Sequence, residues 1–69
     1  GMINPRVLKT FTLDANVSDN ESAQTMVDKL LELSGVEEAV VIVDDKAAYL
    51  KVNAKQFNLA NARGILLAN

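Results

Sequence analysis

The fold is decided by residues 37–53, Glu-Glu-Ala-Val-Val-Ile-Val-Asp-Asp-Lys-Ala-Ala-Tyr-Leu-Lys-Val-Asn. Two strand-like runs, 37–43 and 47–53, lie on either side of the polar segment 44–46. Such a segment predicts a tight turn, so the two runs are expected to pair as an antiparallel hairpin. Within the first run, residues 39–43 are apolar at every position, which is typical of a strand buried on both faces.

Working outward toward the N-terminus, residues 6–13 are rich in β-branched and aromatic types and predict another strand. Val7, Phe11 and Leu13 would share one face of it. A polar loop, 14–18, is expected to follow.

A helix is predicted from Asp19 to Ser34. Ser18 and Glu21 have the capping-box spacing that satisfies the first amides of a helix, and Gly35 is expected to end the helix in the left-handed conformation. The predicted buried stripe repeats at steps of three and four. Its members are Ala23, Met26, Val27, Leu30 and Leu33.

A second helix is predicted from Leu59 to about Ala68, with Asn58 as its N-cap. Its expected buried stripe is Leu59, Ala62, Ile65 and Leu66. Gly64 is unfavourable inside a helix, by about 1 kcal/mol relative to alanine. A close approach of the helix to the sheet would explain this glycine.

The predicted order is β-α-β-β-α in a single domain, 1–69, in which Gly1 reads as a tag remnant before the initiator Met2. The predicted fold class is α+β, a ferredoxin-like sandwich with both helices on one face of an antiparallel or mixed sheet. A fourth strand is expected to be short or missing, which gives the strand order first-third-second. A right-handed crossover would give the first strand a parallel neighbour.

Composition excludes several classes of function. The chain has 69 residues and a net charge of −2, and it contains neither cysteine nor histidine. Thiolate and imidazole metal sites, disulfides and the usual general base are therefore excluded. Scattered basic residues disfavour nucleic acid and anionic membranes, and no apolar run is long enough to span a bilayer. We expect a cytoplasmic protein that is not an enzyme and has no cofactor.

The element order and two short motifs resemble the heavy-metal-associated, copper-chaperone-like domain family. Phe11-Thr-Leu13 is similar to the end of that family's first strand, and Leu33-Ser-Gly-Val36 is similar to the end of its first helix. The resemblance covers nearly the whole chain and implies a ferredoxin-like fold. In the family, a Cys-x-x-Cys loop binds a soft metal between these motifs.

The cysteine positions of that family correspond here to Asp19 and Ser22. A carboxylate and a hydroxyl bind soft metals poorly, so the resemblance implies a domain that has lost thiolate metal binding. Asp14, Asp19 and Glu21 could instead form a vestigial carboxylate site for a hard cation. A capping box already accounts for part of this cluster, and calcium requires six to eight oxygen ligands.

The sheet face away from the helices is predicted to carry apolar residues. The candidate interface residues are Leu8, Thr10, Val40, Ile42 and Tyr49. An exposed patch of a few hundred Å² often marks a contact surface, which predicts a protein-interaction or homo-oligomerisation module, for example a homodimer. β-propensity alone could also explain these residues. A further alternative is a small-molecule-sensing regulatory domain, similar to the amino-acid-binding domains of this topology.

Overall fold

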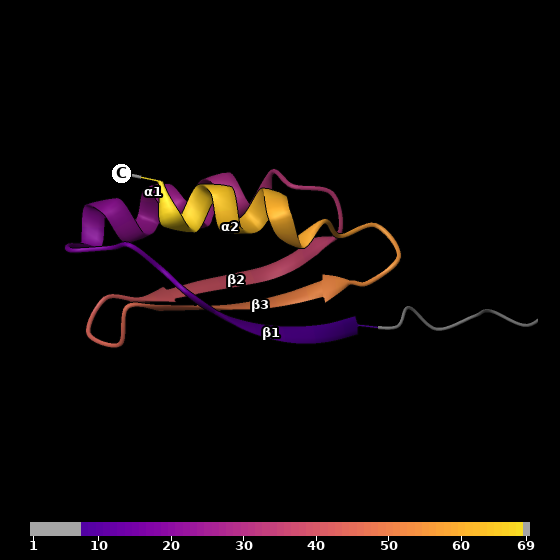
Figure 1. Cartoon of the computed structure of the whole chain (residues 1–69), viewed down its shortest axis with the longest axis horizontal. Helices are drawn as coiled ribbons and strands as arrows, with labels where there is room; N and C mark the ends of the chain where they lie inside the picture. The colour runs from indigo at the N-terminus through magenta and orange to yellow at the C-terminus, as the bar shows by residue number, and fades with distance from the viewer. Residues whose placement is uncertain (1–7, 69) are drawn as a thin grey trace, which may run out of the picture.

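The computed structural model describes residues 8–68 of the chain. Its five elements are β1 (Leu8–Asp14), α1 (Asn20–Leu31), β2 (Val36–Ile42), β3 (Ala47–Asn53) and α2 (Leu59–Leu67). The three strands form one antiparallel sheet in the order β1-β3-β2 (Figure 1). This small α+β arrangement is compatible with a ferredoxin-like fold. The predicted parallel neighbour for β1 is wrong, because β3, which runs antiparallel to both other strands, lies between β1 and β2.

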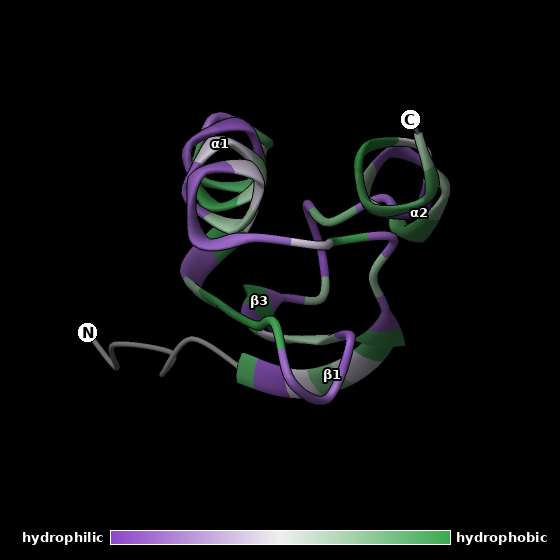
Figure 2. Cartoon of the chain, turned by 90° about the vertical axis from the view of Figure 1, so that its left-hand side faces the viewer, coloured by the Kyte–Doolittle hydropathy of each residue, from purple (hydrophilic) through white to green (hydrophobic). Residues whose placement is uncertain are grey.

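Both helices cover the same face of the sheet, and they lie side by side above it in the end-on view of Figure 2. Helix α1 contacts β2, and α2 contacts β1 and α1. The opposite face of the sheet is left uncovered by the described residues. The molecule therefore has two layers, and its core can form only between the helices and one sheet face.

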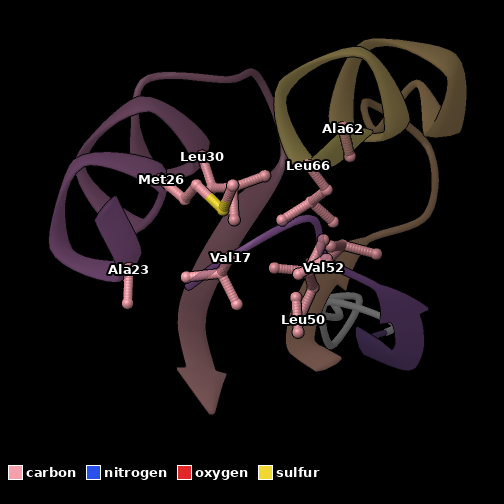
Figure 3. Close-up of a cluster of buried hydrophobic side chains, with 10 residues drawn as sticks. Val17, Ala23, Met26, Leu30, Leu50, Val52, Ala62 and Leu66 are labelled. Atoms are coloured by element: carbon pink, nitrogen blue, oxygen red, sulfur yellow. The ribbon is translucent and has the colours of Figure 1, made fainter. Parts of the chain in front are cut away.

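The core is small and entirely apolar, and its side chains meet between the helices and the central strand (Figure 3). Its buried members are Ala15, Val17, Ala23, Met26, Leu30, Ala48, Leu50, Val52, Ala62 and Leu66. The alternating pattern of β3 places Ala48, Leu50 and Val52 in this core, as the sequence predicted. None of the described residues buries a polar or charged side chain.

The loop between β1 and α1 is more than a polar connection, because Ala15 and Val17 belong to the core. The backbone amide of Ala15 donates to the carbonyl of Lys46 at 2.9 Å, and the amide of Asn16 donates to the carbonyl of Leu66 at 2.7 Å. These bonds tie the loop both to the hairpin turn and to the end of α2. The predicted loop is therefore confirmed at residues 15–18, whereas Asp14 belongs to β1 and two residues of the loop are buried rather than polar and exposed.

Helix α1 is shorter than predicted at its C-terminal end. It ends at Leu31, and the amides of Glu32 and Leu33 donate to the carbonyls of Lys29 and Leu30 at 3.2 and 3.1 Å. Each of these hydrogen bonds joins an amide to the carbonyl three residues earlier. Bonds of this kind satisfy the last carbonyls of a helix and end it. Gly35 has the expected positive φ of 85°, but it lies beyond the helix, immediately before β2.

Three further predictions concern the hairpin turn and α2. The tight turn at residues 44–46 and the N-cap role of Asn58 are confirmed, and the Asn58 side chain accepts from the amide of Ala60 at 2.9 Å. The close approach expected at Gly64 is wrong, because a Cβ added there would meet nothing within 4 Å. This glycine lies on an exposed side of α2 and has no packing role.

Candidate interaction surface

The uncovered face of the sheet is built by the residues that alternate with the core residues along each strand. On β3 these are Ala47, Tyr49 and Lys51, and β3 is the central strand. The register aligns them in rows across the sheet. The row of Tyr49 contains Val40 on one side and Thr12 on the other.

Apolar side chains gather in one half of this face. Val40 is 50% exposed, Tyr49 is 40% exposed and Ile42 is 36% exposed, although all three are large and apolar. Val40 and Tyr49 are direct cross-strand partners, and Ile42 is paired with Ala47 in the next row. We call Val40, Ile42, Ala47 and Tyr49 the open-face patch.

The other half of the face is polar. Lys51 Nζ and Glu38 Oε2 form an ion pair at 3.4 Å, and Thr10 lies across from Lys51 on β1. Both side chains of the ion pair are well exposed, so it contributes little to stability. Its position is more informative, because it limits the open-face patch on one side.

The predicted interface residues are therefore only partly brought together. Val40, Ile42 and Tyr49 are neighbours, whereas Leu8 is paired with Asn53, four residues along β3 from Tyr49. Four residues of strand correspond to about 13 Å, and the row of Thr10 and Lys51 intervenes. Leu8 is 42% exposed but lies apart from the open-face patch.

The acidic residues near the start of α1 form a helix cap. Asp19, in extended conformation, is the N-cap, and its Oδ1 accepts a hydrogen bond of 2.7 Å from the amide of Ser22. The prediction of Ser18 as the cap is wrong, because the first intrahelical bond joins the amide of Ala23 to the carbonyl of Asp19. A carboxylate accepts a stronger, charge-assisted bond than a hydroxyl would.

A carboxylate cation site is not formed by these residues. Across residues 8–68, no three acidic side chains come together as a group that could hold a metal ion. Asp14, Asp19 and Glu21 thus remain separate, and the carboxylate of Asp19 is already engaged by the helix. Two hydrogen bonds from Ser22 lower the pKa of Asp19 below its ordinary value of 3.8. The bond from the backbone amide of Ser22 has the larger effect, and the bond from its side chain has the smaller one.

We expect the cap to make stability depend on pH. Because the pKa of Asp19 is lower in the folded chain than in the unfolded chain, its contribution is present above pH 3.8 and is lost as pH falls through the folded value. Asp19→Asn keeps the acceptor but cannot titrate, so its Tm should fall less on acidification than that of the wild type. Asp45→Asn, in the hairpin turn, is the control and should retain the wild-type profile. Identical profiles for all three proteins would contradict this role for Asp19.

Two grooves lie outside the open face. One, of about 440 Å³, runs between the helices and has Met26 and Ile65 among its lining residues. The other, of about 350 Å³, lies between α2 and the outer side of β1 and is lined by Thr12, Leu13, Asp14, Arg63 and Leu67. Sequence reasoning missed both, because each joins residues of distant segments. The sequence signal for the second groove was Leu67, an apolar residue outside the predicted buried stripe of this helix. In the structure Leu67 is 57% exposed.

The comparison with known families identifies the chain. A sequence model of the YajR YAM domain matches residues 11–65, which include most of β1 and extend into α2. The chain belongs to the YajR YAM domain family. No curated protein and no solved structure matched this YAM domain.

This result corrects the resemblance to heavy-metal-associated domains. The matched family is a different one, so the correspondence of Asp19 and Ser22 with metal-binding cysteines has no basis in family membership. In this chain Asp19 is the N-cap of α1, and its side chain accepts a hydrogen bond from the amide of Ser22. The motifs that supported the resemblance are the end of a strand and the turn after a helix, which packing alone can impose on unrelated families.

Proposed function

We propose that this YAM domain is a non-catalytic interaction module that pairs with a second copy of itself through the open-face patch. The observation that carries the proposal is the direct pairing of Val40 with Tyr49 on a sheet face that no described helix covers. Burying valine or isoleucine contributes roughly 1.5–3 kcal/mol per side chain. Three of the six large apolar residues that are exposed within residues 8–68 belong to the open-face patch.

The arrangement of the patch favours a symmetric partner. Tyr49 lies on the central strand, so a two-fold axis near its ring would place the Val40 and Ile42 of each copy against the other sheet. Stacked sheets pack about 10 Å apart with interdigitated side chains. The dimer would then have four layers, with a helical layer on each outer side. Within each copy we propose a ferredoxin-like topology that lacks a paired fourth strand.

The size of the face sets the expected affinity. Strands about 4.8 Å apart and seven residues long give a face of roughly 10 by 20 Å between backbone axes. Two such faces amount to only about 400 Å² of flat sheet in total, below the range of stable, specific interfaces. We therefore expect a dimer that dissociates on dilution. Light scattering on a sizing column, across a dilution series, measures this directly.

Tyr49→Asp should abolish the dimer, because it places a charge at the centre of an apolar contact, where an unpaired carboxylate is strongly disfavoured. The expected mass is that of a monomer at every concentration. Circular dichroism should show that both helices remain, because Tyr49 points away from the core.

Leu31→Asp is the matched control. Leu31 is also a large exposed apolar residue, 48% exposed, but it lies on α1 and not on the sheet. This variant should keep the wild-type association. A wild-type chain that is monomeric at the highest concentration, or a folded Tyr49→Asp variant that still dimerises, would contradict the proposal.

A small-molecule-sensing function has one observation in its favour, the groove of about 440 Å³ between the helices. Its apolar lining residues Met26 and Ile65 lie beside the polar groups of Asn16 and Thr25, a mixture that is common in ligand pockets. A thermal-shift screen of amino acids would test it, since a bound effector raises Tm by mass action. A stabilising amino acid whose effect Ile65→Asp removes would favour this second function.

A further inference from the structure

The two edge strands of the sheet, β1 and β2, differ in how readily they can pair with a further strand. On β2 the register shifts between Val36 and Glu38, so Glu37 forms a bulge, and both glutamates are exposed. Bulges and edge charges are devices that protect a strand from pairing with other chains. By contrast, β1 pairs with β3 through seven consecutive residues without a shift. Among residues 8–68 no strand pairs with its outer side.

The outer side of β1 has a groove beside it. Helix α2 overhangs the second half of the strand, where Leu67 and Arg63 line the groove together with Leu13. Within residues 8–68, Leu67 is the most exposed of the large apolar residues. An extended segment paired with β1 would direct alternate side chains toward α2. One of these side chains would contact Leu13 and Leu67, so the groove favours an apolar residue at that position.

The charges along this edge favour an acidic segment. Arg63 is exposed in the groove, and Lys9 is exposed on the helix side of β1, since it alternates in step with Phe11 and Leu13. The structure shows no ion pair for either cation within residues 8–68. Asp14, at the end of the strand, also lines the groove and is the one acidic residue among its lining residues. Next to Lys9 and Arg63, carboxylates on the α2 side of an added strand would meet cations.

A second copy of β1 fits this edge poorly. Two antiparallel β1 strands centred on Phe11 would place Lys9 of each copy opposite Leu13 of the other, close to Arg63. Like charges brought together in this way oppose association. The occupant that the edge favours is thus a segment of different sequence.

We propose that the β1 edge binds an extended peptide of another protein as an added strand. The side chains that this peptide turns toward α2 are apolar next to Leu13 and Leu67, and acidic next to Lys9 and Arg63. Backbone hydrogen bonds to β1 supply affinity, and the groove supplies selectivity. This surface is separate from the open-face patch and does not depend on dimerisation.

The test uses the acetylated peptide Thr-Glu-Thr-Val-Thr-Glu-Thr and a matched peptide in which lysine replaces both glutamates. Each is titrated into the isotope-labelled full chain and followed by amide chemical shifts in solution. We expect the glutamate peptide to shift the amides of β1 and of Arg63 and Leu67, with binding that weakens as salt is added. The lysine peptide should bind at least about tenfold more weakly, and so should a glutamate peptide with methylated backbone amides.

Variants of the chain then distinguish binding in the groove from nonspecific electrostatic attraction between peptide and chain. Arg63→Glu should weaken binding of the glutamate peptide by about tenfold or more. Lys55→Glu makes the same change of charge at an exposed residue of the turn before α2, and it should leave the affinity within about twofold. The proposal is overturned if the glutamate peptide causes no shifts at about 1 mM, if its shifts map to β2 or the open face, or if both variants weaken binding equally.

Discussion

Replacing Gly35 with alanine is expected to destabilise the domain by about 2–5 kcal/mol. Gly35 has a φ of 85°, which residues with a side chain rarely adopt, and an added Cβ would lie 2.8 Å from the amide nitrogen of Phe57 and 3.0 Å from the carbonyl oxygen of Asn53. Both neighbours are backbone atoms and cannot move aside independently. A chain of this length has a total stability on the order of 5 kcal/mol, so much of the population should unfold. Urea denaturation followed by circular dichroism measures the change.

The control for this prediction is the same substitution at Gly64. No atom lies within 4 Å of a Cβ placed there, and the residue is inside α2 with ordinary helical conformation. Gly64→Ala should therefore stabilise the domain by up to about 1 kcal/mol. A Gly35→Ala variant as stable as the wild type would show that the turn between α1 and β2 can adopt another conformation.

The effect of Gly35 reaches beyond its own turn. The carbonyl of Gly35 accepts from the amide of Asn53 at 2.6 Å, and the carbonyl of Asn53 accepts from the amides of Gln56 and Phe57. This short network joins the start of β2 to the end of β3 and to the approach to α2. Phe57 in turn packs against Phe11 of β1, with ring centroids 5.4 Å apart. Strain at Gly35 should thus disturb all three strands.

Leu30→Ala is expected to cost about 2–5 kcal/mol. Leu30 is fully buried where α1 faces the sheet and α2, as Figure 3 shows. Truncation removes apolar contact and leaves a cavity that a core with this many alanines has few long side chains to fill. The variant should unfold at markedly lower urea concentration.

Leu31→Ala provides the comparison, because Leu31 is adjacent in sequence and belongs to the same helix. Its side chain is 48% exposed, so the loss should stay within about 0.5 kcal/mol. Similar losses for the two variants would mean that α1 is rotated relative to the position described above. The pair therefore also tests which side of α1 faces the sheet.

Much of the fold followed from local patterns. The boundaries of β3, the tight turn before it and the Asn58 cap were all predicted from residue types and spacing, because each depends on neighbours in the sequence. One local signal was misleading. At the start of α1 the capping-box spacing of Ser18 and Glu21 indicated the wrong residue, because Asp19 has the extended backbone and the side-chain acceptor of the actual N-cap.

Predictions of proximity were less successful, since they depend on packing. The sequence placed Leu8 with Tyr49 on one face, and the register separates them by the row of Lys51 and Glu38. Gly64 was expected to lie against the sheet and lies in open space, whereas Gly35, expected only to end a helix, is held against the backbone of the β3–α2 connection. Local composition does not encode these distances.

The sequence by itself determined the class of the domain and the chemistry that it lacks. Without cysteine and histidine there is no thiolate or imidazole ligand, and this conclusion needed no coordinates. Only the tertiary structure decided which apolar residues form one patch, which sheet edge is regular, and that Arg63 and Leu67 lie beside that edge. The physical reason is that a side chain's periodicity specifies the face it occupies, whereas register and helix packing specify its neighbours.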